Sequence, residues 1–224
     1  MSEKRKSVKA TSPKGSIMWF KLVKPDQKFK KYTVDLIVDD SPEIRKIINT
    51  MDTLIEDTLK EEMDKATEKK DFKRKAKLAR SKNSSLEEQL DANGQPTGKF
   101  VMKFRLASSG KKKDDSVYQI APPALFNAQA KPYTDAEKAT LQVFNGSIGQ
   151  VSFEMSPYAM ATGDVGVSLK PKAVMIIKIQ QAAADASQFG FSASELQEDS
   201  EFAMEPEEGS AGNSSEASAS NEDF

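Results

Sequence analysis

Apolar and polar residues alternate with a period of two over several stretches of this chain, which predicts β-strands whose two faces can be distinguished. In residues 15–23, GSIMWFKLV, the side chains of Met18, Phe20 and Leu22 fall on one face. Trp19 and Lys21 share the opposite face. We therefore expect Met18, Phe20 and Leu22 in a core and Trp19 with Lys21 on the outside.

The same alternation recurs in residues 31–38, KYTVDLIV, and in residues 99–106, KFVMKFRL. It directs Tyr32 into the core and leaves Lys103 and Arg105 side by side on an outer face. Further strands are expected at residues 116–120, 141–144, 147–155, 165–169 and 173–179. The expected core positions beyond Tyr32 are Val34, Leu36, Val38, Phe100, Met102, Phe104, Leu106, Val151, Phe153 and Met155.

Between the second and third strands the spacing changes to that of an amphipathic helix. Asp40 and Ser41 offer an N-cap, and Pro42 suits the first helical turn. The apolar residues at helical spacing are Ile44, Ile47, Ile48, Met51, Leu54, Ile55, Leu59 and Met63. The following residues 64–82 are strongly basic and compatible with helix, so they form a solvated helix or loop or lie against an anion.

The order of the expected elements indicates the fold class. Loops rich in Asn, Gly and Pro separate the strands, and no βαβ rhythm appears. Numerous short strands with one or two helices predict a mainly β domain, either a small closed barrel or a sandwich. The continuous apolar run at residues 173–179 suggests a strand that is covered on both faces.

Composition narrows the possible chemistry. The 224 residues include no Cys and no His, which excludes thiolate and imidazole metal sites, a Cys nucleophile and a His general base. We therefore expect neither an enzyme nor a metal or other cofactor. No stretch approaches the roughly 18 apolar residues of a membrane span, and the first residues lack the apolar core of a signal peptide, so we expect a soluble, intracellular protein.

The net charge of −1 conceals a strong asymmetry. Of the 34 acidic residues, eleven lie in residues 185–224, where there is no Lys or Arg, so residues 1–184 carry all 33 basic residues against 23 acidic ones. Three parts are predicted: a flexible basic N-terminus at residues 1–12, one domain at 13–184 with a helical insertion at about 41–82, and a disordered acidic tail at 185–224. The tail ends in Glu222, Asp223 and Phe224, which suit either a docking peptide for basic pockets or a merely solubilising tail.

The basic outer faces are interspersed with aromatic residues. Single-stranded nucleic acid requires this combination, because cations neutralise phosphates while flat rings stack on bases of any sequence. The candidate nucleic-acid-binding residues are Trp19, Lys21, Lys30, Lys31, Lys103, Arg105, Lys111, Lys112, Lys113, Tyr118, Tyr133, Tyr158, Lys170 and Lys172.

Several runs carry a more specific resemblance. They are residues 15–38, 100–113, 121–132 and above all 145–179, with the sequence NGSIGQVSFEMSPYAMATGDVGVSLKPKAVMIIKI, together with the terminal Asn-Glu-Asp-Phe. Over these runs the chain resembles the single-stranded DNA-binding proteins of phage replication systems, the T-seven type. It departs from that family in the length of its basic segment 69–82 and in Asn127, where an acidic residue is expected.

The resemblance implies an oligonucleotide/oligosaccharide-binding (OB) fold, a closed five-stranded barrel with extra strands, that coats and protects single-stranded DNA in phage replication, recombination and repair. It implies a tail that competes with DNA and recruits replication proteins, namely DNA polymerase and helicase-primase, in the cytoplasm of the infected bacterial host. A homodimer is compatible with it, and no membrane is involved. By position it assigns Tyr158, Lys170 and Lys172 to DNA and Phe224 to partners.

Three other functions stay open at this stage. A DNA annealing or recombination mediator would share the basic groove, and a phage structural or RNA-binding protein would leave the terminal Phe without an obvious use. A Mg²⁺-dependent nuclease needs only carboxylates and water. Its candidate carboxylates are Asp35, Asp39, Asp40, Asp114 and Asp115.

Overall fold

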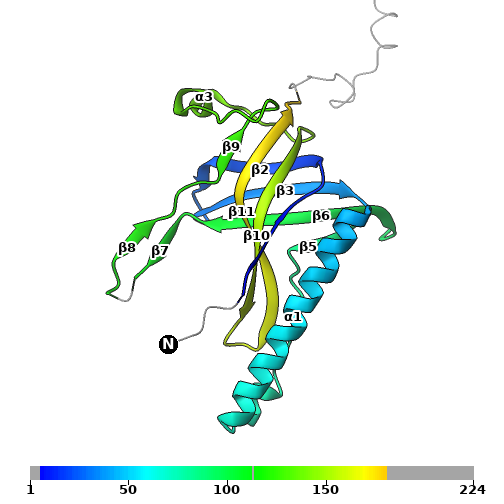
Figure 1. Cartoon of the computed structure of the whole chain (residues 1–224), viewed down its shortest axis with the longest axis vertical. Coiled ribbons are helices and arrows are strands. Elements are labelled where there is room, and N and C mark those ends of the chain that lie inside the picture. The colour runs from blue at the N-terminus through cyan, green and yellow to red at the C-terminus, as the bar shows by residue number, and fades with distance from the viewer. Residues whose placement is uncertain (1–5, 113, 181–224) are drawn as a thin grey trace, which may run out of the picture. The chain divides into compact units, whose positions relative to one another are not determined.

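The computed structural model describes residues 6–112 and 114–180. Five strands hydrogen-bond into a closed ring in the order β2, β3, β6, β11, β10 and back to β2 (Figure 1). Their bounds are Gly15–Asp26 for β2, Lys31–Asp39 for β3, Pro96–Ala107 for β6, Ile148–Ala159 for β10 and Asp164–Lys178 for β11. The predicted mainly β class is confirmed.

Long antiparallel ladders form most of the ring, and two short contacts close it. β3 pairs with β6 from Lys31 opposite Ala107 to Asp39 opposite Lys99. β6 and β11 meet in parallel at Phe104 and Leu169, and β10 meets β2 at Gly149 opposite Gly15. A Cβ atom on Gly15 would lie 2.3 Å from the carbonyl oxygen of Ile37, so this crossing requires glycine.

The interior of the ring holds the core. The Phe104 and Phe153 rings pack with centroids 5.1 Å apart. Tyr32 is buried, as predicted, and Leu106 is partly buried against the core. The other buried positions predicted from the strands are confirmed: Val34, Leu36, Val38, Phe100, Met102, Val151 and Met155.

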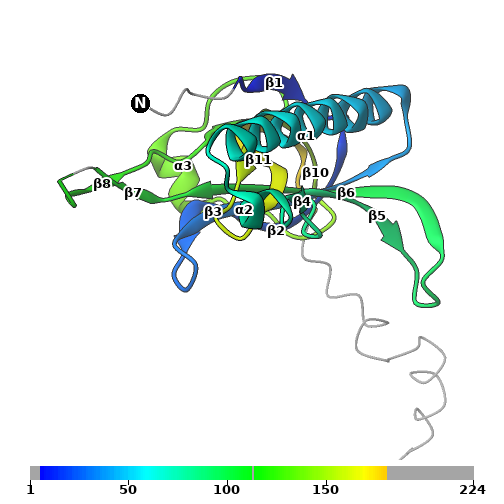
Figure 2. The same cartoon turned by 90° about the horizontal axis from the view of Figure 1, so that it is seen from below.

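The predicted helix is α1, Pro42–Glu68, and it lies along one side of the ring (Figure 2). Ser41 is its N-cap, with its hydroxyl accepting from the backbone N–H of Ile44, and Pro42 stands in the first turn, as expected. Ile44, Ile47, Met51 and Ile55 are buried, whereas Met63 is exposed and the last turns bury Thr58, Glu62 and Ala66 instead. The short helix α2, Phe72–Lys75, and strand β4, Ala79–Arg80, follow in the basic segment.

Shorter elements pair with the strands of the ring or extend from it. β1, Val8–Thr11, pairs with β10, so residues 8–11 are not part of a flexible N-terminus as predicted. β5, Leu86–Leu90, extends the sheet beyond β6, and β9, Ala124–Phe126, pairs with β11. β7, Ser109–Lys111, and β8, Val117–Gln119, form a separate two-stranded hairpin, and α3, Asp135–Thr140, precedes β10.

The structure corrects one face assignment. Ile17, not Met18, is fully buried in the first half of β2, while Leu22 is buried in the second half as predicted. The register of β2 against β3 shifts between Met18 and Lys21, and Trp19 has a φ of 51° there. An irregularity of this kind inverts the alternation, which a strict period of two cannot anticipate.

Two further expectations are corrected. Residues 141–144 form no strand in the structure, because they follow the helix α3 directly and hydrogen-bond to no neighbouring strand. The strands expected at 165–169 and 173–179 are one continuous strand, β11. In its second half Val174 and Ile176 are buried while Met175 and Ile177 are half-buried, so its outer face is only partly covered.

Some predictions lie outside the described residues. They concern Lys113 and the acidic tail 185–224 with Glu222, Asp223 and Phe224. Among the described helices, none combines the length and apolarity that a membrane span requires.

Candidate nucleic-acid interface

The irregularity in β2 turns Trp19 outward. Its side chain is 63% exposed, and its backbone N–H donates to the Oδ1 of Asn145 at 3.0 Å. Lys21 follows on the outer face and forms an ion pair with Asp26 at 2.5 Å. The prediction that Trp19 and Lys21 face outward together is confirmed.

The turn between β2 and β3 carries an aromatic residue that the sequence reasoning missed. Asp26 Oδ1 accepts from the backbone N–H groups of Lys28 and Phe29, both at 2.9 Å, which fixes the turn. The hydrogen bond from Lys21, followed by that from Phe29, lowers the pKa of Asp26. Phe29 is 63% exposed, with Lys28 Nζ 5.4 Å from its ring centroid. The cluster of lysines around a lone Phe in PDQKFKK was the available signal.

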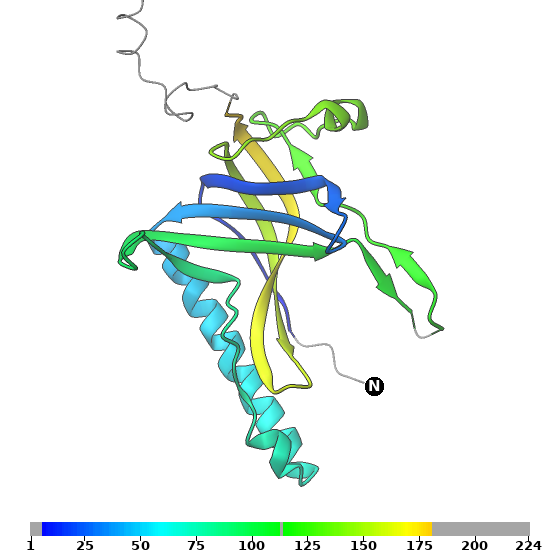
Figure 3. The ribbon, with the colours of Figure 1, turned by 180° about the vertical axis from the view of Figure 1, so that it is seen from behind.

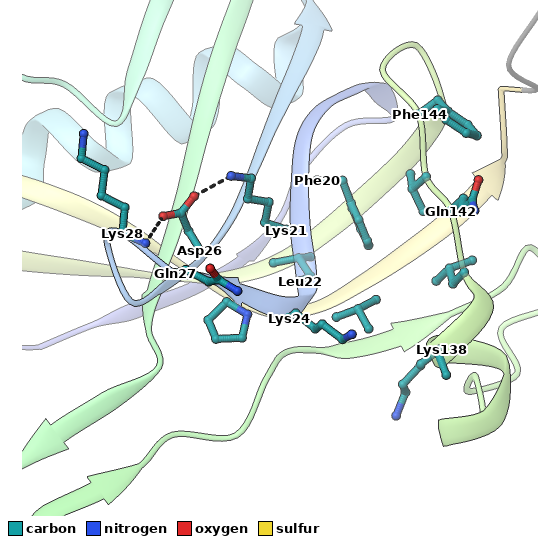
Figure 4. Close-up of a pocket in the computed structure, with 15 residues that line it drawn as sticks. Phe20, Lys21, Leu22, Lys24, Asp26, Gln27, Lys28, Lys138, Gln142 and Phe144 are labelled. Carbon is teal, nitrogen blue, oxygen red and sulfur yellow. Dashed lines mark hydrogen bonds and ion pairs between the residues drawn. The ribbon is translucent and has the colours of Figure 1, made fainter.

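A groove of about 760 Å³ lies between β2 with its turn and residues 138–144 (Figure 4). Phe20, which was assigned to the core, is only half-buried and lines this groove. On the opposite wall Leu141 and Val143 pack against the core, and Phe144 is turned outward. The lining cations are Lys21, Lys24, Lys28 and Lys138. The groove therefore has aromatic walls and a basic rim.

The hairpin of β7 and β8 starts beside the β2–β3 turn and projects from the ring (Figure 3). The backbone N–H and the hydroxyl of Ser108 both donate to the carbonyl of Lys30, at 3.0 and 2.8 Å. Tyr118 lies so close over Gly110 that a Cβ atom there would be 2.5 Å from its ring. Lys111 and Lys112 are exposed at the hairpin's end. This arrangement brings the Lys30, Lys31, Lys111, Lys112 and Tyr118 candidates to one end of the ring.

The register extends the basic surface across three strands. Lys21 of β2 lies opposite Thr33 of β3, and Thr33 lies opposite Arg105 of β6. Arg105 is nevertheless already bound within the protein. Its Nη1 donates to the carboxylate of the buried Asp35 and, at 2.8 Å, to the carbonyl oxygen of Phe104.

Lys103 also has an acidic partner. Its Nζ forms an ion pair with Glu87 of β5. Lys103 and Arg105 thus lie on the outer face, as predicted, but both charges are compensated within the protein.

The remaining candidates do not join this surface. On β10 and β11, Lys170 lies opposite Glu154, and Lys172 forms an ion pair with Glu154 at 2.8 Å. The hydrogen bonds from Lys172 and then Ser7 hold the pKa of Glu154 at about 2.

The two other tyrosines do not line the groove. The Tyr158 hydroxyl lies over Gly166, where a Cβ atom would be 2.6 Å away. Tyr133 is half-buried against the core, and burial, then Glu137, raises its pKa.

Comparison with known proteins bears on the fold. No protein-family model matches the sequence, and no curated protein is similar to it in sequence. Among solved structures, gp2.5, a single-stranded DNA-binding protein encoded by bacteriophage T7, superposes with a TM-score of 0.61 at 17% identity, covering 79% of this chain and 95% of that one. The C-terminally truncated single-stranded DNA-binding protein of bacteriophage Enc34 gives 0.51 at 15% identity, covering 76% and 86%.

The chain has the fold of phage single-stranded DNA-binding proteins. The predicted resemblance is thereby confirmed for the fold, and the ring of five strands is OB-like.

Proposed function

We propose that this protein binds single-stranded DNA without sequence specificity in the groove between β2 and residues 138–144, and that it is a binding protein and not an enzyme. The observation that supports this most is the union of exposed aromatic rings and lysines around that groove. Phe20 and Phe144 line it, and Trp19 and Phe29 flank it on β2 and its turn. Both solved structures compared above are of single-stranded DNA-binding proteins.

The chemistry of the groove favours a single strand over a duplex. Unpaired bases expose flat faces that stack on aromatic rings for roughly 1–3 kcal/mol each, whatever the base. In a duplex those faces are already stacked on one another, so only the phosphates remain available to the lysines. Neutralising phosphates releases counterions, so binding weakens steeply with salt.

The lysines differ in whether an acidic side chain already compensates their charge. Lys24, Lys28, Lys30 and Lys31 are exposed and form no ion pair within residues 6–112 and 114–180. The same holds for Lys111 and Lys112 in the hairpin. We assign the main backbone contacts to these lysines. Lys113 belongs to the same proposal from its place in the sequence.

The candidates with acidic partners have a smaller part in the proposal. They are Lys21, Lys103, Arg105 and Lys172, together with Lys170, which lies opposite Glu154. Tyr133 and Tyr158 stay weaker stacking candidates, because neither lines the groove.

The proposed biological role is to coat and protect single strands during phage DNA replication and recombination, in the cytoplasm of the bacterial host. In this role the acidic tail, residues 185–224, competes with DNA for the basic body. The tail would recruit DNA polymerase and helicase-primase through Glu222, Asp223 and Phe224. Eleven acidic residues tethered to a body with ten excess basic residues support the competition, since tethering gives an effective concentration on the order of millimolar.

The nuclease alternative loses support from the surroundings of its carboxylates. Asp35 faces Arg105, Asp40 faces Arg45, and Asp114 accepts from the hydroxyl of Ser116 in a turn. No group of three or more carboxylates in the described residues is arranged to hold a metal ion. An annealing activity remains compatible with the groove, as an addition to binding.

Fluorescence anisotropy with labelled dT oligonucleotides and a matched duplex, at two salt concentrations, tests the proposal. We expect tight binding of the single strand, much weaker binding of the duplex, and a steep loss with salt. Equal affinity for both forms would overturn it, and incubation with Mg²⁺ should leave the strand intact.

A further inference from the structure

Residues 69–82, which we name the basic spur, hold an unusual concentration of charge that the groove does not use. The segment KKDFKRKAKLARSK contains eight basic residues and one acidic residue. That acid, Asp71, is the N-cap of α2, with its side chain accepting from the backbone N–H of Arg74. Asp71 is the only acidic side chain in the segment, so most of the segment's positive charge is not offset within it.

The basic spur is fixed to the body at several points and is not a loose lysine-rich turn. Arg74 forms an ion pair at 2.7 Å with Glu62, whose side chain is buried in α1. Leu78 is buried in the core. The backbone N–H of Ala79 donates to the carbonyl of Gly163 at 3.1 Å, and that of Ser81 donates to the carbonyl of Val165 at 2.7 Å.

The anchoring ion pairs use the two arginines and no lysine, although Lys75 Nζ donates to the hydroxyl of Thr67 at 2.9 Å. Arg74 is bound to Glu62, and Arg80 is bound to Asp52. The six lysines are exposed and form no ion pair within the part of the chain that the structure describes: Lys69, Lys70, Lys73, Lys75, Lys77 and Lys82. Phe72 stands among them with 68% of its surface exposed. Such a surface combines backbone-neutralising cations with a ring that can stack on a base.

The basic spur lies far from the groove. Figures 1 and 3 show the C-terminal end of α1, which leads into α2, at one end of the body, and α3, beside the groove, at the other. A short oligonucleotide in the groove therefore leaves the basic spur unoccupied.

We propose that the basic spur is a second binding site for the sugar-phosphate backbone of single-stranded DNA, so that one chain holds two DNA segments at once. This goes beyond the proposed function, which needs only the groove. A nucleic acid strand fits better than the protein's own tail, because a strand carries one charge per nucleotide, whereas the tail carries eleven acidic residues in forty. Six lysines within fourteen residues match the denser of the two polyanions.

The test measures how many dT oligonucleotides, each too short to reach from groove to spur, bind per full-length chain. We expect two, the second weaker and more sensitive to salt. The triple variant Lys69→Gln, Lys73→Gln, Lys77→Gln should bind one. The charge-matched control Lys14→Gln, Lys46→Gln, Lys60→Gln, also at exposed lysines without ion pairs in the described residues, should still bind two.

A groove variant, Lys24→Gln, Lys28→Gln, Lys138→Gln, separates this inference from the proposed function. If it loses the tighter oligonucleotide and keeps the weaker one, both sites stand. If the spur variant still binds two, or if a second oligonucleotide binds only after residues 185–224 are removed, the inference is overturned while the groove stands. If the groove variant binds as the wild type does, the proposed function fails and the spur is judged by its own variant.

Discussion

The lysines around the β2–β3 turn and the cations on strands β6 and β11 have very different neighbours. Lys24, Lys28 and Lys30 are exposed and form no ion pair within the described chain. Arg105 is held on the buried Asp35, and Lys172 on Glu154. Both regions look equally basic in the sequence, but a compensated cation stabilises the fold while a free one is available to a phosphate.

The aromatic residues differ in the same way. Trp19 and Phe29 present their rings to solvent, and the exposed Lys28 lies at the Phe29 ring, whereas Tyr133 packs against the core. If this comparison is correct, the affinity for single-stranded DNA depends on the region around β2 and its turn, and the folding free energy depends on the compensated and buried residues.

The largest effect should come from the rings beside the groove. Replacing Trp19→Ala and Phe144→Ala together should lower the affinity for dT oligonucleotides at least about tenfold, because each stacked base contributes roughly 1–3 kcal/mol. Anisotropy titration measures the change. The control Leu90→Ala with Met160→Ala removes two exposed apolar side chains elsewhere and should bind normally. Equal losses of affinity in the two double variants would contradict the comparison.

The free lysines should set the salt dependence. Replacing Lys24→Gln, Lys28→Gln and Lys30→Gln should flatten the slope of log affinity against log salt by about two units, at about 0.7 per phosphate contact on a single strand. Titrations at four salt concentrations give the slope. Lys103→Gln should change it by much less, since Glu87 already compensates that charge. A larger change from Lys103→Gln would reverse the assignment.

Loss of Arg105 should affect stability more than binding. Arg105→Gln leaves the buried carboxylate of Asp35 without its cation, so the thermal midpoint should fall by several degrees. Differential scanning calorimetry measures this midpoint. Lys31→Gln removes an exposed charge from the neighbouring strand β3 and should leave the midpoint nearly unchanged. An unchanged midpoint in Arg105→Gln would show that the ion pair does not support the fold.

The smallest effect concerns acid stability at Glu154. Its pKa is lowered from 4.5 to about 2, so its interaction with Lys172 stabilises the fold above about pH 4.5 and this contribution is lost as the pH falls toward 2. Glu154→Gln should flatten the pH dependence of stability in that window and leave DNA affinity at neutral pH nearly unchanged. Urea unfolding at pH 2.5, 3.5 and 5 measures it, and an unaltered pH profile would contradict the role given to this pair.

The strands, the long helix and most of the core follow from local pattern. Tyr32, Phe104 and Phe153 could be placed inside because the alternation in their strands is uninterrupted. Ile17 could not, because the irregularity at Trp19 depends on contacts with Asn145, which is remote in sequence. Local pattern therefore predicts faces only as far as the next irregularity.

The candidate site was predicted less completely than the fold. Trp19, Lys30 and Tyr118 were found from the alternation of the strands and the aromatic residues among basic ones, and the structure places the hairpin of Tyr118 beside Lys30. Phe20 and Phe144 were missed because a groove is formed by segments that no local pattern connects. The ion pair between Arg105 and Asp35 was also unpredictable, since both residues lie on strand positions whose partner depends on the register.

Trp19 is the chain's only tryptophan, and it lies in β2 directly before Phe20, which lines the groove, so its intrinsic fluorescence reports on a strand bound beside the groove. Titrating the full-length protein with dT oligonucleotides should quench this emission saturably, in step with the anisotropy of a labelled oligonucleotide, and added salt should restore it. If the labelled oligonucleotide binds tightly while the Trp19 emission stays unchanged, the single strand lies elsewhere, and the account of this groove is contradicted.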